Sequence, residues 1–340
     1  MQKFNEIKSF GFLYSRRCPA QCKHCGTSST PFYKGTLSIE IIEKILKALP
    51  KYNINSIGIS GGEPLLYYKE MLHIGKIAKK HQIGITLFSN AFWAKNSTVA
   101  TEYLSNLKEN SLTSLQLSTD EFHQEFIHLK NIINASNVAN SLDIPCTIMI
   151  PSKASGWSTI NTVSYLEMEC NAEIITHPIH PIGRALELDD SYFQWRDLEI
   201  EGCELVGQIE VDTTGETAIC PPASDFDETN PLIVGNLKSS SVDDAVERFQ
   251  NRLLYWVLGN YGPLGLYYLF IESGVEVTAK IDGKISNCQL CQQLTSNKSY
   301  FKDFMTLEKI NLKEDNSITL ENQKRCHEII NKSQKRNLNE

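Results

Sequence analysis

The chain has no surplus of basic residues and no long apolar run. Its 340 residues include 33 Lys and Arg against 40 Asp and Glu, which gives a formal net charge of −7. This balance argues against a general nucleic-acid binder, which usually shows a basic face. The N-terminus lacks the apolar stretch of a signal peptide, and no apolar run approaches the ~18 residues of a membrane span. We therefore expect a cytoplasmic protein with no nucleic-acid partner and no membrane contact.

Cysteine is plentiful, because the chain contains ten of them. Thiols stay reduced in the cytoplasm, so these cysteines are better explained as metal ligands or reactive groups than as disulfides. The chain is long enough for one large domain and a smaller one, and its 41% hydrophobic content is enough for a substantial core.

Three cysteines lie close together in the stretch "RRCPAQCKHCGTSS", at positions 18, 22 and 25. A strand-like segment, Phe10–Tyr14, precedes them, and a loop rich in Gly, Ser and Thr follows. Structural zinc sites and iron–sulfur cubanes usually take four protein ligands, so three ligands leave one metal position open for a substrate or cofactor. Zinc with a distant fourth ligand, or three reduced cysteines of no consequence, are the alternatives.

A second motif, "SIGISGGEPLL", begins at residue 56. Residues 56–60 are typical of a buried strand, and Gly61 and Gly62 form a turn after it, where the backbone can approach a ligand closely. Glu63 lies on this turn, and Pro64 fixes the chain after it. Loops at strand C-termini are where α/β folds place ligand sites.

Together the two motifs resemble the radical S-adenosylmethionine (radical SAM) superfamily. The resemblance implies that Cys18, Cys22 and Cys25 hold three irons of a 4Fe–4S cluster, while SAM chelates the fourth iron. It further implies that the SAM amino group lies at the turn of Gly61, Gly62, Glu63 and Pro64, and that His24 lies near the adenine. The family cleaves SAM reductively to a 5′-deoxyadenosyl radical, which takes a hydrogen atom from the substrate. An electron donor such as flavodoxin or ferredoxin would be needed.

The first half alternates strand-like and helix-like stretches, which predicts an α/β fold of parallel βα units. We expect strands at 10–15, 56–60, 84–88, 114–118, 145–150 and 173–177, and helices at 38–49, 68–80, 97–109 and about 124–142. Six such units agree with the partial (β/α)6 barrel of radical SAM proteins, here assigned to residues 1–194.

Polar residues follow several of these strands. The resemblance places Ser89, Asn90, Ser118 and Asp120 near the SAM ribose and carboxylate, although turn or helix-cap chemistry explains each of them about as well. His123 is expected to be a surface or core histidine. A Gly183–Arg184 pair follows the sixth strand, and we expect the arginine to pair with a carboxylate.

The second half contains four further cysteines: Cys203, Cys220, Cys288 and Cys291. Residues 203–220 predict a β-hairpin with a "DTTG" turn. Four thiolates suit either zinc or a closed 4Fe–4S cluster. The arrangement resembles the SPASM/Twitch auxiliary-cluster domains, which implies a second, auxiliary 4Fe–4S cluster on these four cysteines. We assign residues 195–300 to this domain and 301–340 to a polar helical tail. Cys146, Cys170 and Cys326 are left over, and Cys146 on a strand is best explained as a small core residue.

Several stretches resemble radical SAM epimerases that modify ribosomally made peptides. Those enzymes have two adjacent cysteines at the end of the hairpin, and the second returns a hydrogen atom to the substrate. Here Pro221 follows Cys220, so that donor is absent at this place. We therefore predict modification of a precursor peptide by oxidation, crosslinking or epimerisation. A radical SAM enzyme for a small molecule such as an amino sugar, and a zinc-binding interaction protein without catalysis, are the alternatives. Leader-peptide binding would use the barrel rim, the C-terminal region or a partner.

Overall fold

The computed structural model of the chain falls into two compact units. It describes residues 6–153, 157–195, 197–220, 230–279, 281, 284–297, 299–300 and 320–337. The barrel unit comprises Ser9–Gln194 and Glu210–Glu216, and the C-terminal unit comprises Met1–Lys8, Trp195–Ile209 and Thr217–Glu340. The domain assignments made from the sequence stay predictions, and residues 301–319 of the predicted tail lie outside the described residues.

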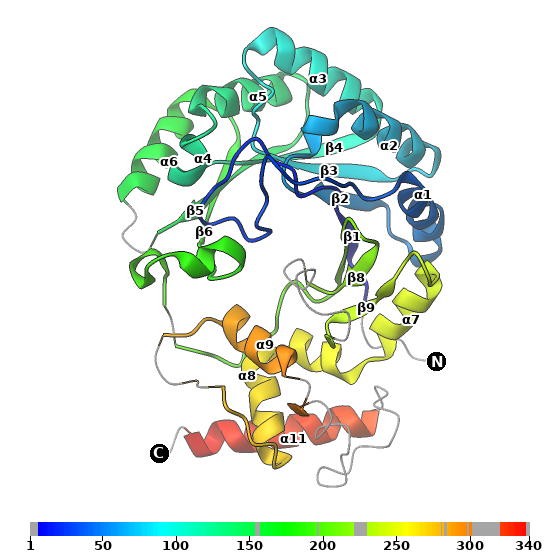
Figure 1. The fold of residues 1–340 in the computed structure, drawn as a ribbon, viewed down its shortest axis with the longest axis vertical. Coiled ribbons are helices and arrows are strands. Elements are labelled where there is room, and N and C mark those ends of the chain that lie inside the picture. The colour runs from blue at the N-terminus through cyan, green and yellow to red at the C-terminus, as the bar shows by residue number, and fades with distance from the viewer. Residues whose placement is uncertain are drawn as a thin grey trace. The chain divides into compact units, whose positions relative to one another are not determined.

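Six parallel strands form the barrel unit, and each pairs with the next along the chain. They are β1 (Ser9–Leu13), β2 (Ser56–Ser60), β3 (Gly84–Ser89), β4 (Leu112–Ser118), β5 (Cys146–Ser152) and β6 (Glu173–Pro178). The longer helices between them are α1 (Ile39–Ala48), α2 (Tyr68–Lys80), α3 (Ser97–Glu109), α5 (Leu129–Ser141) and α6 (Trp157–Glu169). These helices lie outside the arc of strands in Figure 1. The predicted α/β partial barrel is therefore confirmed.

The two faces of this sheet differ in chemistry. Residues that alternate along the strands, such as Phe12, Ile59 and Leu87, are at most 1% exposed and belong to the core. The residues between them include Ser60, Phe88 and Ser118, and these line a cavity. Because strand side chains alternate between faces, one face is apolar packing surface and the other carries serines together with Phe88. The site is built on this second face.

The start predicted for the helix at about 124–142 is wrong. The structure has a short helix α4 (Glu121–Gln124) and then α5, because the Asp120 side chain caps α4 by accepting a hydrogen bond from the His123 backbone N–H. The helix α6 was not predicted. Leu166 is the only buried side chain among those described in α6, so the apolar periodicity of this helix is weak.

Short 3₁₀ helices complete the barrel unit: η1 (Leu49–Tyr52), η2 (Pro64–Tyr67), η3 (Gly183–Glu187) and η4 (Asp190–Tyr192). Two of them, η2 and η3, follow the ends of β2 and β6 closely and bring their first residues to the site.

The predicted hairpin is confirmed as β7 (Gln208–Val211) and β8 (Glu216–Ala218). Its turn is held by Asp212, whose Oδ1 accepts hydrogen bonds from the Thr214 and Glu216 backbone N–H groups at 2.8 and 3.0 Å. The C-terminal unit contains β9 (Ile233–Asn236), α7 (Val242–Asn251), α8 (Leu253–Glu272), α9 (Asn287–Ser296) and α11 (Leu320–Asn337). No helix in the described part of the chain has the length and apolar character needed to cross a membrane.

Candidate functional site

The cysteine triad lies on a loop that follows β1. Cys18, Cys22 and Cys25 all line one cavity of about 360 Å³. The loop is closed at its ends by hydrogen bonds from Cys18 N to Thr30 O (3.1 Å) and from Thr30 N to Arg16 O (3.0 Å). The chain between these hydrogen bonds places the three cysteines around one cavity, as the sequence predicted.

Burial makes the thiols of Cys18 and Cys22 weak acids in the absence of a positive charge. It raises the pKa of Cys18 to about 12, and the charge of nearby Glu63 adds to the rise. It raises the pKa of Cys22 as well, with further contributions from Asp120 and the other two thiols. Bound metal reverses this tendency, because a coordinating thiol is deprotonated outright. The donor set and its burial therefore fit a cationic metal centre.

The Gly61–Gly62 turn is pressed against the start of the cysteine loop. Gly62 N donates to Ser15 O at 2.6 Å, and Glu63 N donates to Arg17 O at 2.8 Å. A Cβ on Gly62 would lie 2.2 Å from Arg17 O, and Gly61 has a φ of +151°. Glycines are needed here because the turn lies so close to the backbone of the cysteine loop. They also allow a ligand to come close to the turn. Both also line the cavity.

The Glu63 carboxylate is buried and is not among the groups that line the cavity. It accepts hydrogen bonds from the backbone N–H of Leu65 (3.0 Å) and of Asn90 (2.8 Å) and from the Ser89 hydroxyl (3.0 Å). Burial raises the pKa of Glu63 to about 7, although these hydrogen bonds lower it. Glu63 therefore ties the turn after β2 to the end of β3. Pro64 begins η2 directly behind it.

Ser89 uses its full hydrogen-bonding capacity. Its hydroxyl donates to Glu63 and accepts from the Trp93 indole N–H at 2.9 Å and from the Ala91 backbone N–H at 3.0 Å. A hydroxyl offers one donor and two acceptor positions, so none is left for a ligand in this arrangement. The neighbouring Asn90 lies closer to the cysteine loop. Its side-chain nitrogen is 3.4 Å from the Cys18 sulfur, and Asn90 lines the cavity.

Among the described residues, Arg184 forms hydrogen bonds with backbone carbonyls and not with the carboxylate that the sequence suggested. Its guanidinium donates to the carbonyls of Cys22 (3.0 Å) and Ser29 (2.8 Å), and its backbone N–H donates to Cys25 O at 3.1 Å. Gly183 before it has a φ of +56°, and a Cβ there would lie 2.3 Å from Gly26 O. The Gly-Arg pair on η3 thus braces the cysteine loop. The sequence showed the pair but not its partners, because backbone carbonyls leave no signal in a sequence.

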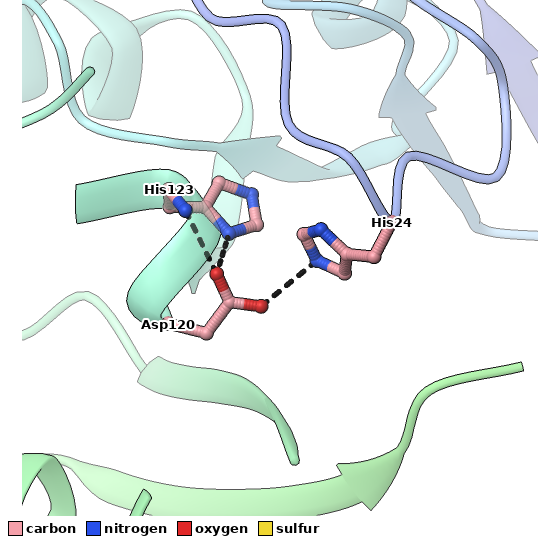
Figure 2. A group of neighbouring side chains, drawn as sticks. All are labelled: His24, Asp120 and His123. Atoms are coloured by element: carbon pink, nitrogen blue, oxygen red, sulfur yellow. Dashed lines mark hydrogen bonds and ion pairs between the residues drawn. The ribbon is translucent and has the colours of Figure 1, made fainter. Parts of the chain in front are cut away.

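Asp120 lies between two histidines, as Figure 2 shows. Its Oδ2 is 2.9 Å from His24 Nε2, and its Oδ1 is 2.9 Å from His123 Nδ1. Both imidazoles line the cavity, as does Ser118, whereas Asp120 does not. His123 was expected to be a core or surface residue, and the structure instead brings it to the site. The signal was present, since "TDEFH" contains a capping Asp with a histidine three residues later.

In the C-terminal unit, three of the four cysteines that the sequence assigned to a second metal site influence one another's ionisation. Burial raises the pKa of Cys288 to about 11, and Cys203 adds to the rise. Burial also raises the pKa of Cys291, with contributions from Cys203 and Cys288. Cys288 and Cys291 lie three residues apart near the start of α9 and therefore share one face of that helix. Cys220 lies just after β8 and is partly buried.

Arg184→Met is expected to loosen the cysteine loop. The variant loses two charge-assisted hydrogen bonds and leaves two carbonyls without these donors, so we expect a stability loss of about 2–4 kcal/mol. Reaction of the metal-free protein with a thiol reagent measures the loop directly, and Cys22 and Cys25 should be modified faster than in the wild type. Arg325→Met, on α11, is the control. Equal labelling rates in Arg184→Met and the wild type would contradict the bracing role.

Comparison with known proteins agrees with this site. Residues 12–145 match the sequence model described as the Radical SAM superfamily. A relative from Bacillus subtilis (strain 168), described as "Putative peptide biosynthesis protein YydG", is 31% identical over 147 residues. That match covers 42% of this chain and 46% of the relative, so the chain spans about half the length of the curated relative it matches.

Solved structures share the fold. The structure described as "Native anSMEcpe with bound AdoMet" has a TM-score of 0.53 and 15% identity, and the match covers 88% of this chain and 98% of that one. The structure "Native anSMEcpe with bound AdoMet and Kp18Cys peptide" has a TM-score of 0.53 and 13% identity, and the match covers 95% of this chain and 99% of that one. The cysteine loop, the Gly-Gly-Glu turn behind it and four of the six parallel strands lie wholly or partly within the part of the chain that matches the radical SAM superfamily.

Proposed function

We propose that this protein is a radical SAM enzyme that modifies a peptide. The observation that carries the proposal is the convergence of Cys18, Cys22 and Cys25 in one cavity, with the Gly61–Gly62 backbone in its wall. Three thiolates would hold three irons of a 4Fe–4S cluster and leave the fourth iron open for SAM. When bound, the cluster and SAM supply a 5′-deoxyadenosyl radical that takes a hydrogen atom from the substrate.

The chain's own residues hold and shape this site. Arg184 and the Gly61–Gly62 turn fix the cysteine loop from two sides. Glu63 and Ser89 fix the turn from behind, because their side chains form hydrogen bonds with other groups of the protein. We assign the backbone of Gly61 and Gly62, rather than the Glu63 carboxylate, to the SAM amino group. Asn90 and Ser118 line the cavity, and we assign them to the SAM ribose and carboxylate.

A peptide substrate is supported by the comparisons. The relative from Bacillus subtilis is described as a peptide biosynthesis protein, and one of the solved structures with this fold is described with a bound peptide. These names concern those proteins, and the transfer to this chain is part of the proposal. The reaction is an oxidation, a crosslink or an epimerisation, and the electron comes from a donor such as flavodoxin or ferredoxin.

The auxiliary site belongs to the same proposal. Cys203, Cys220, Cys288 and Cys291 would hold a second 4Fe–4S cluster in the C-terminal unit. The proximity of Cys203, Cys288 and Cys291 supports this, because Cys203 raises the pKa of Cys288, and Cys203 and Cys288 together raise that of Cys291. A bound metal would supply the positive charge that reverses this tendency. An auxiliary cluster could take an electron from the substrate radical, which oxidation or crosslinking requires.

The activity is tested with protein reconstituted without oxygen and reduced with dithionite. The wild type should form 5′-deoxyadenosine from SAM, and a Cys18→Ala variant should form none. Candidate precursor peptides are then analysed by mass and by the chirality of their residues. A loss of two hydrogen atoms identifies oxidation or crosslinking, while an unchanged mass with a D-residue identifies epimerisation. Iron-loaded wild-type protein that forms no 5′-deoxyadenosine would contradict the proposal.

The auxiliary cluster predicts a specific metal content. The wild type should hold about eight irons per chain, and a Cys288→Ala/Cys291→Ala variant about four. The variant should still form 5′-deoxyadenosine, because its cysteine loop is intact. Cys146→Ala/Cys170→Ala is the matched control and should keep about eight irons. If the wild type instead holds about four irons and one zinc, and the Cys288/Cys291 variant loses the zinc, the site is a zinc site.

A further inference from the structure

Two of the three sulfurs in the cysteine loop have a polar side chain beside them. Asn90, directly after β3, places its side-chain nitrogen 3.4 Å from the Cys18 sulfur. Thr27, two residues after the third cysteine, places its hydroxyl oxygen 3.5 Å from the Cys25 sulfur. Both residues line the same cavity as the triad. The function proposed so far gives these two contacts no role.

The direction of the Asn90 contact is fixed by the turn that follows β3. The backbone N–H of Phe92 donates to Asn90 Oδ1 at 3.0 Å, and a backbone N–H can only donate. The oxygen of the amide must therefore face Phe92, which leaves the NH₂ group to face Cys18. The backbone N–H of Asn90 also donates to Glu63 Oε2 at 2.8 Å, and Asn90 is buried. The protein itself thus aims an N–H donor at the Cys18 sulfur.

The direction of the Thr27 contact follows from the charge of a metal-bound thiolate. A coordinating thiol is deprotonated, so its sulfur can only accept a hydrogen bond. The Thr27 hydroxyl must then donate to Cys25, and its oxygen is left to accept from the Ser29 hydroxyl, 2.8 Å away. Ser29 is buried, and its carbonyl accepts from Arg184. The Thr27 hydroxyl is therefore positioned by a residue that the Arg184 guanidinium holds.

The surroundings of Cys18 show what such a donor does to charge on sulfur. Burial raises the pKa of Cys18, and the charge of Glu63 adds to the rise. The hydrogen bonds from the backbone of Ala20 and from the Asn90 side chain act in the opposite direction and lower this pKa. They do so because a hydrogen-bond donor stabilises the negative form of the group that accepts from it.

The same physical effect applies when a cluster on this loop gains an electron. The reduction potential of an iron–sulfur cluster depends on its net charge and on the hydrogen bonds to its sulfurs. A donor stabilises the reduced, more negative state more than the oxidised state, so it raises the potential. The effect is stronger in a buried site, because the low dielectric screens it less.

We propose that the Asn90 amide and the Thr27 hydroxyl donate hydrogen bonds to the thiolates of Cys18 and Cys25 and thereby raise the reduction potential of the cluster. Both residues act through the cysteines, and their donors make the cluster easier for an electron donor to reduce. The Asn90 amide has two N–H bonds, so one remains available for SAM. The inference rests on the proposed function, since it requires a 4Fe–4S cluster on the cysteine loop.

Two substitutions each remove one donor and keep the local structure. Asn90→Ser keeps an oxygen that can accept from the Phe92 N–H, as serine does in such turns, but its side chain is shorter and has no N–H group. Thr27→Val keeps the shape of the side chain and lacks the hydroxyl. Asn131→Ser is the matched control. The Asn131 amide donates to the Phe92 carbonyl of the same turn at 3.2 Å, and no cysteine among the described residues accepts from it.

The test is a redox titration followed by electron paramagnetic resonance on the Cys288→Ala/Cys291→Ala protein, without SAM. In the proposed function this parent carries only the cluster of the cysteine loop, and leaving out SAM removes any effect of Asn90 on cofactor binding. At the potential that half-reduces the parent, Asn90→Ser and Thr27→Val should each lower the ratio of reduced to oxidised cluster at least about threefold. This corresponds to a shift of about 28 mV to more negative potential, since a tenfold change in a one-electron couple is about 59 mV. Asn131→Ser should leave the ratio unchanged.

The ratio separates tuning from a purely structural role, because it is measured only on clusters that have formed. If Asn90→Ser does not load its cluster, Asn90→Thr takes its place, since threonine can accept from the turn in the same way. An unchanged or increased ratio at either position, or an equal fall in Asn131→Ser, would overturn the inference. A parent protein that holds no reducible cluster on the cysteine loop would overturn the proposed function instead.

Discussion

Three thiols that line one cavity form the constraint on which the rest of the barrel unit depends. Two of them are costly to ionise where they lie, because burial and neighbouring negative groups raise the pKa of Cys18 and Cys22. A protein can keep such a group of thiols together only if the backbone around them is held firmly. The loop has no helix or strand of its own, so its shape must come from contacts with other segments.

Those contacts are made to the backbone carbonyls of the loop. The backbone N–H groups of Gly62 and Glu63 donate to carbonyls before Cys18. Arg184 donates to the carbonyls of Cys22, Cys25 and Ser29, and Gly183 lies close to that of Gly26. Both approaches come from chain segments just beyond the C-terminal ends of strands, β2 and β6. A side chain on Gly62 or Gly183 would collide with the loop. Parallel strands bring these ends to one edge of the sheet, which explains why a barrel of this kind can hold the loop.

Most of the fold and the location of the site could be predicted from the sequence. Alternating strand and helix patterns predicted six parallel strands, since β1 to β5 each carry buried apolar residues. The cysteine spacing and the Gly-Gly-Glu turn predicted which segments meet. What the sequence could not show is which hydrogen-bond partner a polar side chain takes. Arg184 binds carbonyls rather than a carboxylate, and Glu63 and Ser89 are engaged within the protein. Asp120 orients two histidines, which depends on distances set by the fold.

Mössbauer spectroscopy tests the central claim, that three cysteines hold a cluster with one open iron. The Cys288→Ala/Cys291→Ala variant is the best sample, because in this account it carries the first cluster alone. When SAM is added to the oxidised cluster, about one quarter of the iron signal should change its isomer shift, since one iron of four gains new ligands. A spectrum that SAM leaves unchanged, or a protein that holds no iron on this loop, would contradict the account.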